Sequence, residues 1–244
     1  MTAEQWARTV RHQLGLGRLL PLGGPRDGAW ISEEAALGVL RAAVADLPGV
    51  RLGAVRIGPA LPEEAHEPAV PSPPSALPPG PLRLGAEFEA TPAEPLPATA
   101  ERLRTVLAGA AAGRLGLELG EVDLRVTALL EEEAERSSVR VAEPPRAAEA
   151  GAGAGDETLA ALAALAVPGV ARLTGVLGRP VHIEDRPTGD GSLPRRHVRV
   201  ELAVGADRRT VDVAREVRAA VGAALPDAPT VAVLVTAVGG LGQS

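Results

Sequence analysis

Two copies of one short motif decide the fold that we predict for this chain: Leu47-Pro48-Gly49-Val50 and Val167-Pro168-Gly169-Val170. Proline forces the residue before it out of helical geometry, and glycine readily takes the left-handed conformation that closes a helix. Each motif follows apolar residues at helical spacing and precedes a run that alternates like a strand. We therefore interpret both motifs as the end of a helix followed by the start of a strand.

A second helix pattern and an apolar closing strand follow each motif. The closing strand of the first copy, Val122 to Leu129, reads V-D-L-R-V-T-A-L, and that of the second, Val231 to Val238, reads V-A-V-L-V-T-A-V. The first copy is longer than the second, and a proline-rich stretch at 59–81 accounts for the difference. The order of elements indicates one small unit of helices and strands used twice.

We predict an α+β fold of two tandem β-α-β-β-α-β units, each an antiparallel sheet with two helices on one face. The first unit covers residues 28–130 and the second 156–239, although the second has no clear first strand. A flexible linker at 131–155 joins them, because that stretch combines acidic with small residues. Residues 1–27 precede the first unit as an N-terminal helical arm.

The first helix of each unit has signals for its start and its inner face. Ser32 caps the first helix, and Glu33 and Glu34 lie in its first turn, where the helix dipole favours acidic side chains. Asp156 is the expected cap of the corresponding helix in the second unit. We expect the buried stripe of that helix to consist of Leu159, Leu162, Ala163 and Ala166.

The insert at 59–81 is rich in proline, alanine, glutamate and serine. Its closely spaced prolines are Pro71, Pro73, Pro74, Pro78 and Pro79. Such a composition favours an extended chain without a core of its own, so we expect the insert to be poorly ordered.

The closing strand of the second unit is apolar on both faces. Its residues Val231, Val233 and Val235 lie on one face, and Ala232 and Leu234 lie on the other. A sheet that is covered on one side only has no need for apolar residues on both. We therefore expect the first unit, the arm or another subunit to cover the second face.

Composition excludes several classes of function. The net charge is −6 and aromatic residues make up 1% of the chain, whereas a nucleic-acid-binding protein needs a basic face and usually aromatic platforms. Cysteine is absent, which excludes disulfides, thiolate metal sites and a cysteine nucleophile. All 25 basic residues are arginine, which with the many glycines and prolines is typical of a high-GC bacterium. Without a signal-peptide pattern or a long apolar run, we expect a soluble, cytoplasmic protein that reaches a membrane only through a partner.

The arm has a short amphipathic pattern, because Trp6, Val10 and Leu14 recur at helical spacing over residues 2–16. This pattern suits a helix that docks on a partner or a membrane surface, but the favoured interpretation is a helix that folds back on the first unit and buries Trp6. The residues that we expect to contact a partner come from the arm and from the closing strand: Trp6, Arg11, Arg18, Val231, Val233 and Val235.

Other polar residues form only weak candidate sites. His182 and Glu184 alternate on one strand, and a hairpin would bring His197 close to them. Such a set suits a metal or acid–base chemistry, but solvated polar residues on a hairpin are the favoured interpretation. The glycines of the arm lack the preceding strand and the Lys-Ser/Thr pair of a phosphate loop. Arg11, Arg18 and Arg26 could bind an anion there, but a plain surface is the favoured interpretation. We therefore predict no catalytic, cofactor-binding or metal-binding residues.

The pattern from Trp30-Ile31-Ser32-Glu33-Glu34 to the first Pro-Gly-Val motif resembles the start of the alkaline-shock-protein family of bacterial envelope stress proteins. In the second unit, Val198 to Val204, Asp212 to Arg218 and the final valine strand resemble the family's later elements. Together the two copies cover about residues 28–130 and 156–239. The family usually has one copy per chain and no proline-rich insert.

The resemblance implies a small non-enzymatic module that assembles with itself or with membrane-anchored partners. The whole chain is also similar to actinobacterial proteins that carry the name of a nucleopolyhedrovirus fibrillar protein, although no residue pattern supports a viral or fibrillar role. The leading hypothesis is a non-catalytic interaction or scaffold protein linked to envelope stress. The alternative is a small-ligand or anion sensor with arginines at the seam between the units. An enzyme comes third, and would need the two histidines and Glu184 buried together.

Overall fold

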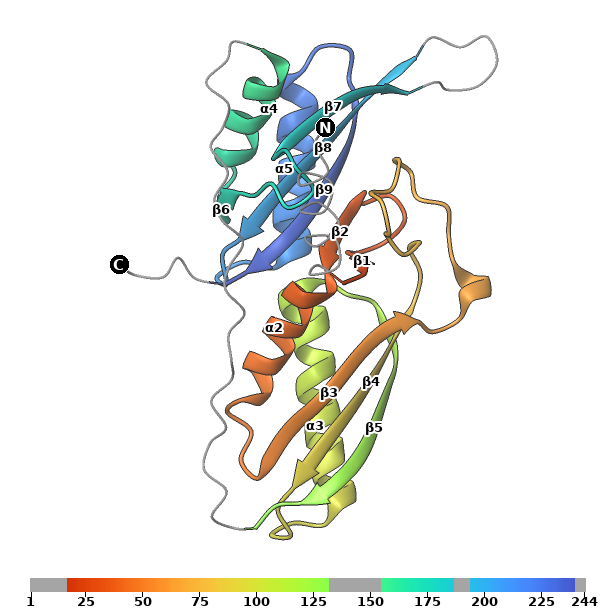
Figure 1. The fold of residues 1–244 in the computed structure, drawn as a ribbon, viewed down its shortest axis with the longest axis vertical. Helices are drawn as coiled ribbons and strands as arrows, with labels where there is room; N and C mark the ends of the chain where they lie inside the picture. Colours follow the sequence, from red (N-terminus) through yellow and green to blue (C-terminus); the bar gives the residue numbers. More distant parts are fainter. Residues whose placement is uncertain (1–16, 132–154, 187–193, 240–244) are drawn as a thin grey trace, which may run out of the picture.

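The computed structural model describes residues 17–131, 155–186 and 194–239. Within these ranges the chain forms four α-helices, two short helical turns and nine strands in two sheets (Figure 1). The α+β class predicted from the sequence is confirmed. The sheets are mixed, however, and not antiparallel as expected, because helices α3 (Leu96–Ala110) and α5 (Thr210–Ala224) each connect two neighbouring parallel strands.

The first half of the chain builds a sheet in the order β3-β4-β5 with two helices packed on it. Its elements are α2 (Glu33–Val44), β3 (Val50–Pro59), the 3-10 turn η1 (Pro62–Glu64), β4 (Leu82–Ala90), α3 (Leu96–Ala110), the π-helical turn η2 (Ala111–Leu115) and β5 (Leu119–Leu129). Ser32 caps α2 as predicted, since its Oγ accepts a hydrogen bond from the Ala35 N–H.

The second half of the chain, joined by β1 and β2 from the first half, builds a larger sheet in the order β1-β2-β9-β8-β6, with β7 on the same edge of β8 as β6. Its elements are β1 (Leu19–Pro21), β2 (Ala29–Ser32), α4 (Asp156–Leu165), β6 (Val170–Leu173), β7 (Val181–Arg186), β8 (Arg195–Val204), α5 (Thr210–Ala224) and β9 (Thr230–Val238). α4 and α5 pack together on one face of this sheet.

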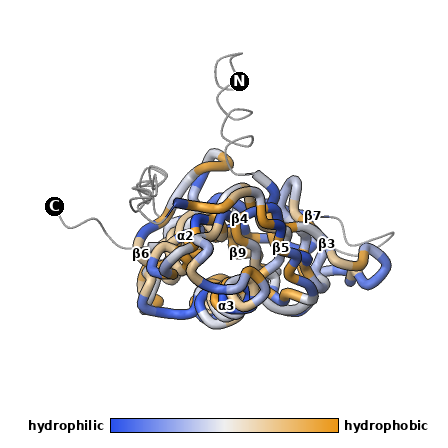
Figure 2. Tube along the Cα trace, turned by 90° about the horizontal axis from the view of Figure 1, so that it is seen from below, coloured by the Kyte–Doolittle hydropathy of each residue, from blue (hydrophilic) through white to orange (hydrophobic). Residues whose placement is uncertain are grey.

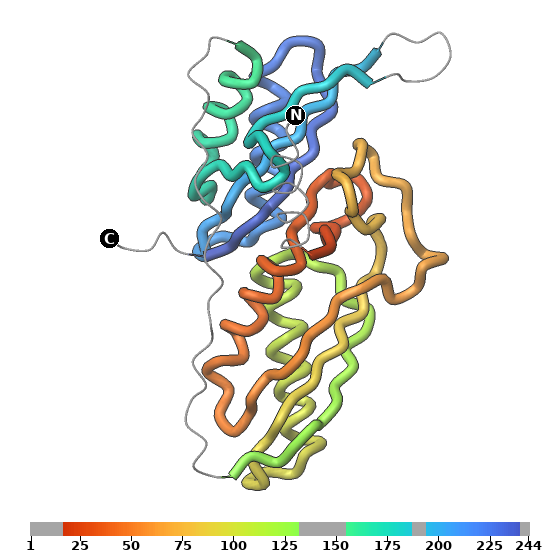
Figure 3. The backbone as a smooth tube through the Cα atoms, in the orientation of Figure 1, coloured from red at the N-terminus to blue at the C-terminus, as the bar shows by residue number. Residues whose placement is uncertain are grey.

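Strand β2 joins the sheet of the second half although it belongs to the first half of the sequence. It pairs in parallel with β9, with Trp30 opposite Leu234, and the red start of the chain lies between the two halves (Figure 3). The expectation that this strand opens the first unit's own sheet is therefore wrong. β2 also supplies the strand that the second unit lacks in sequence. The boundaries of the two predicted units stay a prediction.

The two Pro-Gly-Val motifs end helices as predicted. Gly49 and Gly169 both have positive φ, +71° and +93°, and each precedes a strand. Their carbonyl oxygens accept equivalent hydrogen bonds, from the N–H of Thr91 after β4 and from that of Gly205 after β8. The local geometry of the two glycines thus matches, even though the surrounding sheets differ in size.

One hydrophobic core runs through both halves, from α2 and β4 to α5 and β9. Figure 2 shows the apolar stretches of the helices and strands and the hydrophilic loops between them. A second, smaller core lies on the other face of β9, where Leu19, Trp30 and Val70 pack on Ala232 and Leu234. The prediction that this face is covered is confirmed, and the cover comes from the first half of the chain.

The proline-rich insert is part of this cover, so the expectation of poor order is wrong. The Leu77 N–H donates to the Leu19 carbonyl, and the Ala69 N–H donates to the Pro25 carbonyl. The Trp30 Nε1 donates to the Leu77 carbonyl at 3.2 Å, which fixes the indole under the insert. Hydrogen bonds of this kind and the burial of Val70 order a segment whose composition alone favours an extended chain.

Candidate interaction surface

Helix α4 begins at Asp156, and its cap is Gly155 rather than Asp156 as predicted. Asp156 and Glu157 instead occupy the first turn, where their charges suit the positive end of the helix dipole. After Thr158 the helix contains only alanine and leucine. Polarity therefore gives no signal for which of its faces turns inward.

The inner face of α4 consists of alanines, and its leucines point outward. Ala160, Ala161 and Ala164 are buried. The exposed fractions of the three leucines are 48% for Leu159, 57% for Leu162 and 40% for Leu165. The expected buried stripe of Leu159, Leu162, Ala163 and Ala166 is therefore wrong: both leucines and Ala166 are exposed, and Ala163 alone packs partly buried against the core. The small alanine side chains let α4 approach α5 closely, and larger ones would hold the helices apart.

We call Leu159, Leu162 and Leu165 the leucine stripe. They recur every three residues and so lie on one side of α4. The helix itself lies at the flank of the molecule (Figure 1). Single exposed leucines are ordinary, but three contiguous ones on one helix face mark a surface suited to a partner.

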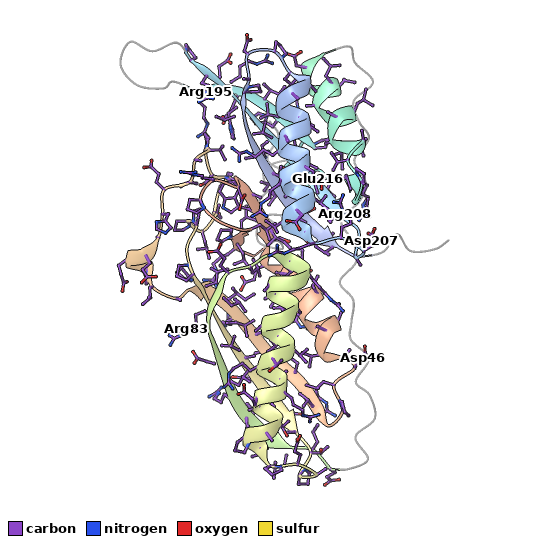
Figure 4. All side chains as sticks on the ribbon, turned by 180° about the vertical axis from the view of Figure 1, so that it is seen from behind. Asp46, Arg83, Arg195, Asp207, Arg208 and Glu216 are labelled. Atoms are coloured by element: carbon purple, nitrogen blue, oxygen red, sulfur yellow. The ribbon has the colours of Figure 1, made fainter. Side chains whose placement is uncertain are left out.

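The charged residues at both ends of the leucine stripe have partners within the chain. At the start of α4, Asp156 pairs with Arg196 and Glu157 pairs with Arg179. Beyond its end, Arg208 forms two hydrogen bonds with Glu216 on α5 and donates a third to the Pro168 carbonyl at 2.7 Å. Arg208 and Glu216 lie beside one another in Figure 4. A partner on the leucine stripe therefore needs no compensating charges.

The predicted contact residues of the closing strand do not lie on a surface. Val231, Val233 and Val235 are buried in the main core, on the face of β9 that α2 and α5 cover. The prediction that they contact a partner is wrong, because the chain's own helices fill the space in front of them.

Arg18 protects an edge of the smaller sheet. Its Nη2 donates to the Ile57 carbonyl at 2.5 Å, while a Glu33 carboxylate oxygen accepts from the Ile57 N–H at 3.4 Å. The two side chains occupy backbone groups on the free edge of β3 that an incoming strand would otherwise use. Trp6 and Arg11 lie outside the described residues.

His182, Glu184 and His197 come together on β7 and β8 as the hairpin prediction requires. Glu184 lies opposite His197, and the His182 Nε2 is 3.7 Å from a Glu184 oxygen. The hydrogen bond from Arg186 holds the pKa of Glu184 below its usual value. His182 and Glu184 are half exposed while His197 is buried, so the three are not enclosed together. In the described part of the chain, no group of three acidic or histidine residues could hold a metal ion.

Arginines do gather where α5 meets the first half of the chain. Arg215 binds both oxygens of Asp27 at 2.8 Å, which lowers the pKa of that carboxyl group. Arg218 donates to the Arg26 carbonyl, and Arg209 donates to the Ala112 carbonyl. These three guanidinium groups hold the two halves together and are already occupied by groups of the chain itself.

Glu201 is a buried residue that the sequence pattern did not single out. Its Oε2 accepts from the Leu177 N–H at 3.0 Å, but its Oε1, 3.3 Å from the Arg199 guanidinium, makes no well-formed hydrogen bond. Burial raises the pKa of Glu201 to about 7. The sequence offers one signal of this burial. Glu201 lies within the alternating strand Val198 to Val204, and the residues before and after it in the chain are apolar.

None of the helices described by the structure is long and apolar enough to cross a membrane. Comparison with known proteins adds no family assignment: neither a protein-family model nor a curated protein sequence matches this chain. The resemblance to alkaline-shock proteins therefore stays a prediction.

Proposed function

We propose that this chain is a non-catalytic scaffold protein that associates with further copies of itself through the leucine stripe of α4. The observation that carries the proposal is the outward orientation of Leu159, Leu162 and Leu165 above a buried face of alanines. Removing apolar side chains from water is the main source of free energy in association. The described residues of the chain leave these leucines 40% to 57% exposed.

The size of the leucine stripe favours weak, reversible association. Three half-exposed leucines present an apolar area on the order of a few hundred Å², below the roughly 800 Å² per partner of a standard stable interface. A chain with such a surface remains monomeric when dilute and associates as its concentration rises. This behaviour suits a scaffold that collects many copies at one place.

The anion-sensor alternative is less favoured than the scaffold, because the arginines between the two halves of the chain are already bound. Arg209, Arg215 and Arg218 would have to give up partners within the chain before they could bind a ligand. An enzyme is also less favoured, because His182 and Glu184 remain open to solvent. Following the resemblance to alkaline-shock proteins, we place the scaffold in the cytoplasm of a bacterium and link it to envelope stress, with any membrane contact made by a partner.

Light scattering of the purified protein over a concentration series tests the proposal. We expect the average mass to rise with concentration for the wild type and to stay at the monomer value for Leu162→Glu, which places a charge in the centre of the stripe. Leu61→Glu is the matched control, because Leu61 is similarly exposed at 40% but lies far from α4 in sequence. A strictly monomeric wild type, or association that Leu162→Glu leaves unchanged, contradicts the proposal.

A further inference from the structure

We infer that the outer edge of β5 is a docking site for an extended strand, and that residues 138–143 of the same chain supply this strand. The site is separate from the leucine stripe, and the inference does not rest on the proposed function. The segment belongs to the linker that composition predicts to be flexible, and it lies outside the described part of the chain. The shape of β5 and the residue pattern of the segment indicate where it binds.

Within the described residues, the outer edge of β5 has no neighbouring strand. β5 pairs only with β4 and lies at one border of the smaller sheet (Figure 1). At the opposite border, Arg18 and Glu33 bind backbone groups of β3. An edge strand presents a row of backbone donors and acceptors, and an extended chain that pairs with it satisfies both.

The second half of the chain shows how the equivalent edge is filled. β9 follows α5 and runs parallel to β8, just as β5 follows α3 and runs parallel to β4. The other edge of β9 is covered by β2, a short strand from a distant part of the sequence. The outer edge of β5 is therefore the position that corresponds to the place of β2 beside β9.

Two exposed apolar side chains mark the part of β5 that lacks cover. Val126 is 38% exposed and Leu129 is 61% exposed, although they lie opposite the buried residues Phe88 and Ala90 of β4. The register between β4 and β5 shifts by one residue just after Val126, which is a β-bulge. The bulge brings Val126 and Leu129 onto the same face of the sheet, the face that lies against the core. A strand beside β5 would cover both.

Residues 138–143 match this edge in their pattern. Their sequence is Ser-Val-Arg-Val-Ala-Glu, so Val139 and Val141 lie on the same face of an extended strand. When the chain reverses after β5, an antiparallel strand can place Val139 opposite Leu129 and Val141 opposite Val126. The bulge accounts for the one extra residue on the β5 side. Each exposed side chain of β5 then gains a valine as its cross-strand neighbour.

The segment also matches the edge in length. The same register places the last residue of the pair Pro144-Pro145 opposite Val122. The carbonyl of Val122 already accepts a hydrogen bond from the Arg104 Nε at 3.4 Å. Proline has no N–H to donate to a neighbouring strand, so the two prolines end the pairing at this point. The docked strand therefore extends along residues 124–130 of β5 and no further.

The absence of cysteine allows a test with pairs of cysteines in the full-length chain. We expect Leu129→Cys/Val139→Cys to form an intramolecular disulfide about tenfold faster than Leu129→Cys/Arg140→Cys under the same oxidant, because docking raises the effective concentration of facing thiols. The second pair is the matched control. It closes a loop of nearly equal length, but the side chain of residue 140 points to the opposite face of the strand. Mass spectrometry of the remaining free thiols in dilute protein measures both rates.

The rates separate a docked strand from the other ways in which the segment can behave. Equal rates for the two pairs would show that the segment has no fixed register on β5 and would overturn the inference. If Leu129→Cys/Val139→Cys instead forms covalent dimers in dilute solution, the strand comes from a second copy and its assignment to the same chain is wrong.

Hydrogen exchange provides a second readout that needs no new bond. We expect the backbone amides of residues 124–129 to exchange about tenfold faster in Val139→Asp/Val141→Asp than in the wild type, because the charged side chains cannot cover the apolar residues of β5. The amides of β3, at the opposite border of the sheet, are the internal control and should not change. Unaltered exchange at β5 would contradict docking of this segment.

Discussion

Two buried ionisable residues of β8, His197 and Glu201, respond to burial in opposite directions. Loss of solvation lowers the pKa of His197 to about 4 and raises that of Glu201 to about 7. The usual values are 6.5 and 4.5. Burial therefore favours the neutral form of both side chains, and each links the stability of the fold to pH.

The two residues contribute pH dependences of opposite sign. Because the folded pKa of Glu201 is raised, its contribution to stability is full below pH 4.5 and is lost as the pH rises to about 7, a change of about 3 kcal/mol. Because the folded pKa of His197 is lowered, its contribution is full above pH 6.5 and is lost as the pH falls to about 4, about 2 kcal/mol after allowance for solvent screening. Between pH 4.5 and 6.5 the two contributions to the free energy of unfolding change in opposite directions and largely cancel.

Single substitutions should separate the two contributions. Relative to wild type, we expect the free energy of unfolding of Glu201→Gln to rise between pH 4.5 and 7, and that of His197→Gln to fall between pH 4 and 6.5. Urea unfolding at a series of pH values measures both differences. A difference that does not change with pH for either variant would show that the residue is not buried as described.

Among single glycine replacements, we expect that of Gly116 to lower the free energy of unfolding most. Its φ is +90°, and a Cβ there would lie 2.3 Å from a Val211 methyl group on α5. We expect Gly116→Ala to lower the free energy of unfolding by about 2–4 kcal/mol, because the backbone strain and the clash add. Gly38→Ala, inside α2 with no atom within 4 Å of the new Cβ, should instead stabilise the protein slightly. Similar unfolding midpoints in urea for the two variants would contradict this expectation.

At the scale of elements, local sequence signals predicted whether a segment is a helix or a strand. They did not predict which strands lie next to one another in a sheet. The Ser32 cap, the Pro-Gly stops and the alternation of β4 and β8 each act within a few residues, so the sequence displays them directly. The partner of a strand depends on contacts with distant residues. Nothing near Trp30 in the sequence shows that β2 pairs with β9, about 200 residues away in the chain.

The sequence did not predict the exposed leucine stripe of α4 for a related reason. Because α4 offers alanine on one face and leucine on the other, both faces are apolar and only packing distance decides between them. The rule that the larger apolar residue lies inside fails here, since the close contact with α5 leaves room for alanine alone. Likewise, the insert at 59–81 became ordered through partners such as Leu19 that its own composition does not reveal.

Opposite faces of α4 should therefore respond differently to substitution. We expect Ala164→Leu to lower the free energy of unfolding by about 1–3 kcal/mol, because the added atoms have no space between α4 and α5. Leu162→Ala on the exposed face should change it by less than about 0.5 kcal/mol. Thermal unfolding of dilute protein, where association is absent, compares the two. A larger effect of Leu162→Ala would mean that the leucines, not the alanines, face the core.

At the scale of the whole molecule, three features bind the two halves of the chain together. They are the pairing of β2 with β9, the bidentate contact between Asp27 and Arg215, and a core that continues from one half into the other. The insert at 59–81 adds a fourth contact, because it packs on the outer face of β9 through Val70. Neither half keeps its buried surface covered without the other.

We therefore expect the two halves to unfold together in a single transition. Trp30 reports on the junction, because it is buried on β2 between β9 and the insert, and Trp6→Phe leaves it as the only tryptophan. In this variant the fluorescence of Trp30 and the far-ultraviolet circular dichroism of the whole chain should give the same midpoint in urea, since coincident probes are the mark of a two-state transition. If Trp30 becomes exposed at a clearly lower urea concentration, the junction opens first and the halves are separately stable. Asp27→Asn then provides the control, because weakening the contact with Arg215 should lower both midpoints equally in a cooperative molecule and only the Trp30 midpoint in one with independent halves.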